Sequence, residues 1–191
     1  MPIEALVLLG LITLNGVFAM SEIALVTARR ARLQVLVEEG DRGAAAAMAL
    51  NTEPTRFLST IQVGITSIGI TSGIVGEAAF AYPLSQWLIG LGVKPGNASL
   101  GATVLVVVVI TYVSIVIGEL VPKRLGQIWP EAIARRVATP IRWLATATRP
   151  FVRLLSSSTD LLLRLFGTRG TRETSVTEEE IHALIQEGSD H

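Results

Sequence analysis

Three apolar segments set the first limit on how this chain can fold. Residues 3–28, 56–76 and 99–121 are each long enough to cross the hydrocarbon core of a bilayer as a helix, which takes about 20 mainly apolar residues. The second segment continues toward residue 91 after an expected break. Half of the 191 residues are hydrophobic and 17% are charged, which excludes an ordinary soluble domain of this size. The sequence therefore predicts an all-α membrane protein with three transmembrane helices, whose transmembrane domain covers residues 1–128.

The basic residues predict the side of the membrane on which each loop lies. Of the 16 Lys and Arg residues, only Lys94 falls between the second and third apolar segments; the others lie between the first two segments or from Lys123 onward. Because Lys and Arg accumulate in cytoplasmic loops, we expect a multi-pass plasma membrane protein with its N-terminus outside and its C-terminus in the cytoplasm. Arginines beside membrane segments need no nucleic acid partner. The lack of cysteine excludes disulfides and thiolate metal sites.

Polar residues inside the first two segments point to a site, because lipid makes them costly. In the first segment, Asn15 and Glu22 are seven residues apart and share one helical face, with Ser21 beside them. The second segment carries two opposite stripes, namely Thr60, Gly64, Ser67 and Thr71 on one side and Gln62, Thr66, Gly69, Gly73 and Gly76 on the other. The glycine-rich stripe has the spacing of a helix packing face. We expect Glu77, just beyond these stripes, at the outer surface.

The third segment has a polar stripe that leads into the motif GELVPKR. Four residues, Thr103, Thr111, Ser114 and Gly118, share one sector of about 80° around the helix axis. Glu119 follows directly, and we expect the helix to break at Pro122 and Lys123.

The proline in this motif predicts a freed carbonyl beside a carboxylate. Pro122 has no N–H, so the carbonyl of Gly118, four residues back, loses its helical donor and needs another partner in lipid. That oxygen lies beside Glu119, with hydroxyl and amide oxygens on the other helices. Such an oxygen-only set suits a hard cation, namely Mg²⁺, Ca²⁺ or Na⁺, rather than zinc or copper. Two plainer interpretations are an ion pair between Glu119 and Lys123 and a proline that only ends the helix.

Three stretches of the sequence resemble a known family. LNGVFAMSEIALVTARRARL, IQVGITSIGITSGIVGE and GELVPKRLG are similar, in this order, to the transmembrane domain of the CorC/cyclin M family of magnesium transporters. The resemblance implies a three-helix domain, a homodimer in the lipid bilayer, and Mg²⁺ export coupled to Na⁺ entry. It also implies a cation bound near mid-membrane by residues matching Ser21, the polar stripe of the second helix and Glu119.

One departure from the family pattern affects the expected ligands. Many relatives carry Asn early in the second helix, where this chain has Ile65, Thr66 and Ser67. Ser67 is the preferred replacement because it shares a stripe with Thr60 and Thr71, and Thr66 is the alternative. With Asn15, Ser21, Gly118 and Glu119, these form the candidate metal site.

Two function classes follow from these residues and the resemblance. One is a transporter that exports dehydrated or partly hydrated Mg²⁺ by alternating access, with Pro122 as the joint. The other is a membrane-embedded Mg²⁺ sensor or regulator with no transport of its own. A channel is a weaker option because one acid per chain faces the expected path. None of these is an enzyme.

The chain after the third segment has a different organisation. Pro130, Pro140 and Pro150 are expected to divide residues 129–167 into short amphipathic helices at the cytoplasmic interface, with a soluble linker as the alternative. Residues 168–191 are expected to form a polar linker and the start of an acidic helix capped by Thr177. Nucleotide-binding CBS modules follow in the family. We therefore expect the chain to stop before them, and ATP to act only through those modules.

Overall fold

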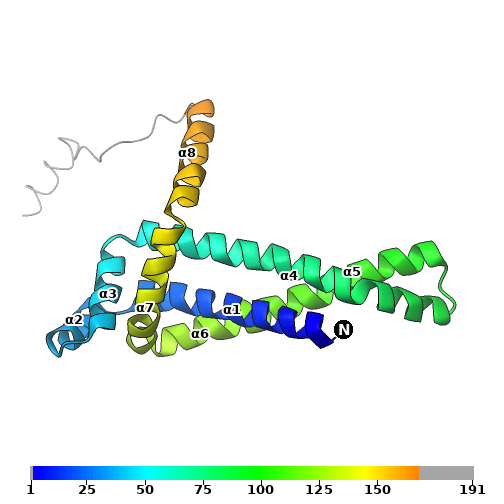
Figure 1. Ribbon diagram of the computed structural model, residues 1–191, viewed down its shortest axis with the longest axis horizontal. Coiled ribbons are helices and arrows are strands. Elements are labelled where there is room, and N and C mark those ends of the chain that lie inside the picture. Colours follow the sequence, from blue (N-terminus) through cyan, green and yellow to red (C-terminus); the bar gives the residue numbers. More distant parts are fainter. Residues whose placement is uncertain (1, 168–191) are drawn as a thin grey trace, which may run out of the picture. The chain divides into compact units, whose positions relative to one another are not determined.

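The computed structural model describes residues 2–167 as helices, and no strand occurs in that range. In chain order the elements are α1 (Pro2–Thr27), α2 (Arg30–Glu38), α3 (Arg42–Thr52), α4 (Pro54–Gly90), α5 (Pro95–Ile115), the π-helical turn η1 (Val116–Leu120), α6 (Val121–Ile128), α7 (Pro130–Ala147) and α8 (Arg149–Leu165) (Figure 1). Residues up to Thr148 form one compact unit, and α8 belongs to a second unit. The expected linker and acidic helix lie outside the described residues.

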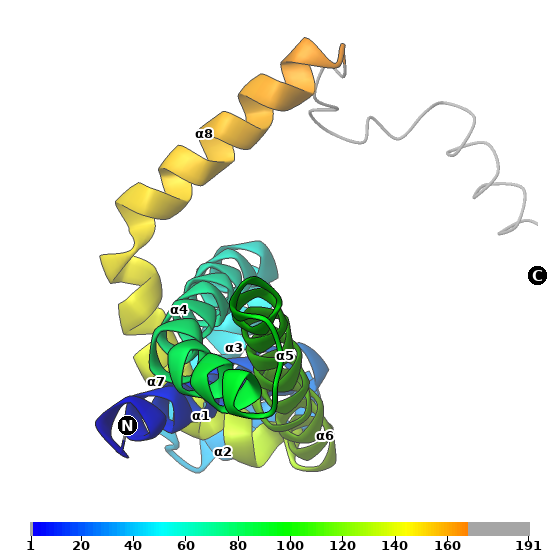
Figure 2. The same ribbon diagram turned by 90° about the vertical axis from the view of Figure 1, so that its right-hand side faces the viewer.

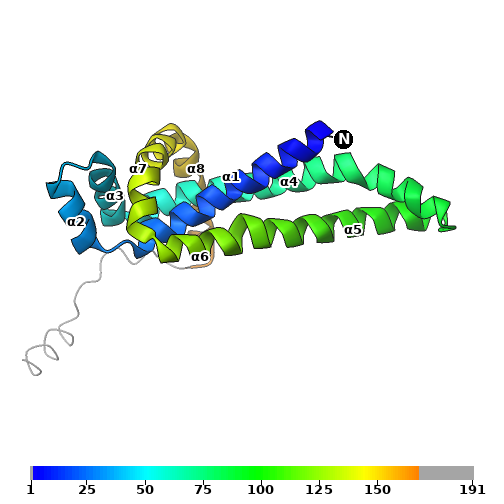
Figure 3. The same cartoon turned by 90° about the horizontal axis from the view of Figure 1, so that it is seen from below.

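Three helices are long and apolar enough to cross a membrane, as predicted. They are Ile3–Thr27, Pro54–Gly90 and Pro95–Ile128, the last formed by α5, η1 and α6. They pack against one another along the bundle, with α4 and α5 joined by a short turn in which Gly92 has a positive φ (Figures 2 and 3). The fold class predicted from the sequence is confirmed in its helices and its three candidate spans.

Proline residues interrupt these helices less than expected. The expected break after residue 76 is absent, because α4 runs continuously to Gly90 with Pro83 inside it. Pro140 likewise lies inside α7, whereas Pro130 and Pro150 lie in the first turns of α7 and α8. A proline at the start of a helix removes no intrahelical hydrogen bond.

An apolar core forms where α1, α2, α3, α4 and α7 meet. Its fully buried side chains include Leu25, Leu33, Phe57 and Ile61. From α7 come Ala134, Ala138 and Ile141, spaced as one face of a helix. The apolar face of α7 therefore packs against protein, and its expected position at the cytoplasmic interface stays a prediction. Within the second unit α8 buries no side chain, and its place at the membrane interface stays a prediction.

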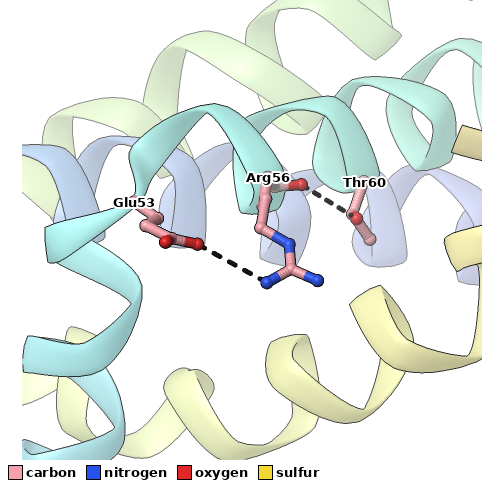
Figure 4. Close-up of polar contacts among 3 residues, drawn as sticks. All are labelled: Glu53, Arg56 and Thr60. Carbon is pink, nitrogen blue, oxygen red and sulfur yellow. Dashed lines mark hydrogen bonds and ion pairs between the residues drawn. The ribbon is translucent and has the colours of Figure 1, made fainter. Parts of the chain in front are cut away.

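Paired polar groups hold the helix ends around this core. Asp41 caps α3 by accepting a hydrogen bond from the Ala44 N–H at 3.0 Å, and its other oxygen lies 2.9 Å from Arg135 Nη2. Asn51 Nδ2 donates to the carbonyl of Leu25 at 2.9 Å. At the start of α4, Arg56 pairs with Glu53 at 3.5 Å and its carbonyl accepts from the Thr60 hydroxyl (Figure 4).

Candidate cation site at the proline break

The carbonyl that Pro122 frees has found a partner on another helix. Asn15 Nδ2 on α1 donates to the carbonyl of Gly118 at 2.9 Å, across 103 residues of sequence. Just before the proline, the Val121 N–H bonds to Val116, five residues back, which is the pattern of a π-helical turn. The helix does not end at Pro122 and Lys123 but continues to Ile128, so the expected break is this π turn.

Glycines let α1 approach the π turn closely. A Cβ on Gly16 would lie 3.0 Å from Pro122 Cγ and 3.4 Å from the carbonyl of Ile117. A Cβ on Gly118 would lie 3.2 Å from Asn15 Nδ2, the atom that bonds to its carbonyl. Both contacts are tighter than most side chains allow, so this pair of glycines makes the Asn15–Gly118 hydrogen bond possible.

Two buried oxygen atoms in the described residues near this part of the sequence have no hydrogen-bond partner. Asn15 Oδ1 and Ser114 Oγ are buried and have no hydrogen-bond partner among the described residues. Ser114 lies one helical turn before Gly118 and so shares its face. Most buried polar atoms in native proteins are hydrogen-bonded. Two unpaired oxygens beside one freed carbonyl therefore suit a bound cation or water.

Glu119 adds a carboxylate with no internal ion pair. Its side chain is half-buried, and within residues 2–167 no hydrogen bond or salt bridge joins it to Lys123 or to any other group. The ion-pair interpretation of Glu119 is therefore wrong for this structure. The described part of the chain holds no group of three or more His, Cys, Asp or Glu side chains that could bind a metal. Any cation here would rely on hydroxyl, amide and carbonyl oxygens around one acid.

The other predicted ligands lie apart from this cluster. Ser21 is fully buried and donates to the carbonyl of Val17 at 2.6 Å, but it is six residues and about 9 Å along α1 from Asn15. Ser67 and Thr66 on α4 are exposed at the surface of the protomer, and Thr66 accepts a hydrogen bond from Gln62 at 3.3 Å. The structure thus brings Asn15 and Gly118 into contact, and Glu119 is the next residue along the chain after Gly118.

Ser67 nevertheless lies at about the same level along the helix bundle as Asn15. A Cβ on Gly64 of α4 would lie 3.2 Å from the ring of Phe18 on α1, and one on Gly76 would lie 3.9 Å from Leu8. These contacts show that α1 and α4 are antiparallel and set Ser67 alongside the stretch from Asn15 to Phe18. The side chain points out of the protomer, so its role as a ligand stays a prediction.

The structure gives Glu77 a partner that the sequence analysis did not identify. Thr103 Oγ1 on α5 donates to Glu77 Oε1 at 3.0 Å, and Glu77 Oε2 is buried without a partner among the described residues. The available signal was its position in the apolar run GIVGEAAFAY, where Gly76 and two alanines allow close helix packing. The expected position of Glu77 at the outer surface stays a prediction.

Comparison with known proteins identifies the family of the chain. Residues 6–191 match the family described as the Cyclin M transmembrane N-terminal domain. The chain belongs to this family. With its three apolar helices, this cyclin M domain is a multi-pass membrane domain.

Curated relatives of the cyclin M domain come from several bacteria. UPF0053 protein sll0260 of Synechocystis is 44% identical over 187 residues, covering 98% of this chain and 42% of the relative. The polyamine export protein of Escherichia coli K12 is 30% identical over 184 residues, with 96% and 41% covered. UPF0053 protein YhdT of Bacillus subtilis is 34% identical over 188 residues, with 97% and 41% covered. The chain thus spans about two-fifths of the length of these relatives.

Proposed function

We propose that this domain exports Mg²⁺ across the plasma membrane, coupled to Na⁺ entry, as a homodimer that works by alternating access. The observation that supports the proposal is the Asn15–Gly118 hydrogen bond, which holds a freed backbone carbonyl one residue before the half-buried Glu119. Unpaired acids inside membrane segments usually mark the path of an ion.

The donor set favours a hard divalent cation that keeps part of its water. Mg²⁺ prefers six oxygens and dehydrates reluctantly. The protomer offers Asn15 Oδ1, the Gly118 carbonyl, Ser114 Oγ and the Glu119 carboxylate, and the exposed Ser67 could contribute from α4. Water would complete the coordination. Nitrogen and sulfur ligands, which zinc and copper prefer, are not part of this set.

The π turn is the proposed joint of the transport cycle. In secondary transporters, discontinuous helices place backbone carbonyls at the ion site near mid-membrane. Here η1 separates α5 from α6, and only one side-chain hydrogen bond, from Asn15, holds its freed carbonyl. Exchange of that bond for a cation contact would let α6 move relative to α5 without unfolding the helix.

Polyamine export is a second candidate function. It is favoured by relatives of that name in Escherichia coli and Salmonella typhimurium, which are 30% and 31% identical to this chain. A polyamine carries its charges on ammonium groups that donate hydrogen bonds, and both Glu119 and the unpaired oxygens of Asn15 and Ser114 are acceptors.

Flux into liposomes that contain only the purified full-length protein tests the function. We expect Mg²⁺ flux that depends on an opposed Na⁺ gradient and is lost in Glu119→Gln, whereas Glu53→Gln, in an exposed ion pair, retains it. Flux of spermidine without Mg²⁺ flux would favour the second candidate. Mg²⁺ binding without flux of either substrate would contradict transport and favour a sensor.

Cysteine labelling tests the proposed orientation. Gly96 is exposed with open space around it, and Ala45 is exposed on α3. We expect a cysteine at Gly96 to react from outside the cell, and one at Ala45 only after permeabilisation. Gly43 is a poor labelling position because a side chain there would collide with the backbone of Arg135. The reverse labelling pattern would overturn the orientation.

A further inference from the structure

The contact between α4 and α5 contains a carboxylate that the proposed Mg²⁺ site does not use. Glu77 Oε1 accepts a hydrogen bond from the Thr103 hydroxyl at 3.0 Å. Glu77 Oε2 is buried and has no hydrogen-bond partner among the described residues. Both residues belong to helices that are long and apolar enough to span the membrane. A buried carboxylate in such a place is costly unless a cation compensates its charge.

No basic side chain of the described residues supplies that charge. The three ion pairs resolved in this part of the chain involve Arg32, Arg56 and Arg135, which lie near the α3–α7 end of the bundle. Lys94 is the only basic residue between the second and third apolar segments, and it is exposed just before α5. The negative charge of Glu77 is therefore available to a cation from outside the chain.

This carboxylate is separate from the Glu119 site. Thr103 and Glu119 are sixteen residues apart on one continuous helical segment, or about 24 Å along its axis. Between the two sites, Gly76 packs directly against Ile110, so the helices are in close contact there. One ion cannot contact Glu77 and Glu119 at the same time.

The ligand set at Glu77 suits a monovalent cation. It provides two carboxylate oxygens and one hydroxyl oxygen, with a single negative charge. A bound Mg²⁺ would keep an uncompensated positive charge and would need several waters in a tightly packed helix contact. A monovalent alkali cation neutralises the site and requires fewer fixed ligands.

We propose that Glu77 and Thr103 form a monovalent alkali cation site, of the Na⁺ class, between α4 and α5. Binding at this site does not depend on the proposed Mg²⁺ export. Its role as the site of the coupling ion does rest on that proposed function, and it would put Na⁺ and Mg²⁺ on different parts of the same helix.

Direct binding of radioactive sodium to the purified full-length protein tests the site. The assay is made without Mg²⁺, and choline chloride keeps the ionic strength constant. We expect Glu77→Gln to weaken sodium binding by about tenfold or more, because it removes the charged ligand. Thr103→Val should weaken it several-fold, and Thr103→Ser should restore it. Thr111→Val is the matched control, because Thr111 lies on the same helix and is exposed.

The outcomes separate this site from the Mg²⁺ site and from misfolding. Glu119→Gln should retain sodium binding while it loses Mg²⁺ binding. Equal sodium binding by the wild type and Glu77→Gln would overturn the proposal, as would no saturable binding by the wild type. If Glu77→Gln does not fold, the contrast between Thr103→Val and Thr103→Ser decides the matter. Sodium binding that depends on Glu77, in a protein that moves no Mg²⁺, would support this site and contradict the proposed export.

Discussion

The helix α1 packs in two contrasting ways along its length. Toward its C-terminus it enters an apolar core, in which Leu25, Phe57 and Ile61 are fully buried. Near its middle it lies against the π turn, where Asn15 donates a hydrogen bond to the carbonyl of Gly118. The first region resembles the interior of a soluble protein, and the second keeps polar atoms inside an apolar segment.

The two regions also differ in how completely their polar groups are paired. Around the core, Asp41 bonds to both Ala44 and Arg135, and Asn51 bonds to the carbonyl of Leu25. At the π turn, Asn15 Oδ1 and Ser114 Oγ have no partner among the described residues. This contrast indicates that the core stabilises the fold. The π turn instead keeps unpaired oxygen atoms that the stability of the fold does not require.

The largest expected effect on stability comes from emptying the core. Phe57→Ala should lower the free energy of unfolding by about 3–5 kcal/mol, because it removes a fully buried aromatic side chain and leaves a cavity. Thermal unfolding in detergent measures the change. Val35→Ala, at a position that is 54% exposed on α2, is the control and should change stability little. The folded fraction of Phe57→Ala should bind Mg²⁺ with normal affinity. Weakened affinity would contradict the separation of the core from the π turn.

Pro122→Ala tests the π turn through Mg²⁺ affinity and transport, whereas Phe57→Ala tests the core through stability. The new N–H can reclaim the Gly118 carbonyl from Asn15 and regularise the helix, so Mg²⁺ affinity should weaken by about 1–3 kcal/mol and transport should fall. Calorimetry and liposome flux measure these changes. Pro54→Ala, at an exposed helix start where no intrahelical bond is missing, is the matched control. Normal transport by Pro122→Ala would reduce the proline to a structural role.

Two substitutions of Asp41 separate the contribution of the α3 cap to stability from that of the ion pair with α7. Asp41→Ala should cost about 0.5–2 kcal/mol of stability, because it removes the helix cap. Asp41→Asn keeps a capping oxygen and loses only the pair with the partly exposed Arg135, which is worth about 0–1 kcal/mol. Chemical unfolding resolves the two values. Equal losses would show that the ion pair dominates, and a change in Mg²⁺ affinity would contradict the separation of the two regions.

The smallest effect is expected at two glycines of α4, Gly69 and Gly73, that have open space beside them. Gly73 has no atom within 4 Å of an added Cβ, so Gly73→Ala should leave the stability of the protomer within about 0.5 kcal/mol. Gly126→Ala is the contrast, because its Cβ would collide with Ile23 and lie 2.8 Å from the carbonyl of Met20. Sedimentation of both variants measures oligomeric state. Dissociation caused by Gly73→Ala would identify the Gly69–Gly73 face as the interface of the proposed homodimer.

The prediction of the candidate site succeeded where it rested on backbone chemistry. That Pro122 leaves the Gly118 carbonyl in need of a partner follows from the missing N–H alone, and the structure supplies that partner. The prediction did not find the hydrogen bond of Glu77, because the partner lies on a different helix. It failed for the expected breaks after residue 76 and at Pro140, where α4 and α7 continue without interruption.

The sequence by itself determined the three apolar helices and the carbonyl that must seek a new donor, since each depends on composition or on groups within one helical turn. Only the tertiary structure decided that Asn15 is that donor, that Thr103 meets Glu77, and that Ser67 faces out of the protomer. The physical reason is that the rotation and register of each helix decide such pairings. Rotation and register are fixed by close contacts such as those of Gly16 and Gly76, which act across the whole bundle.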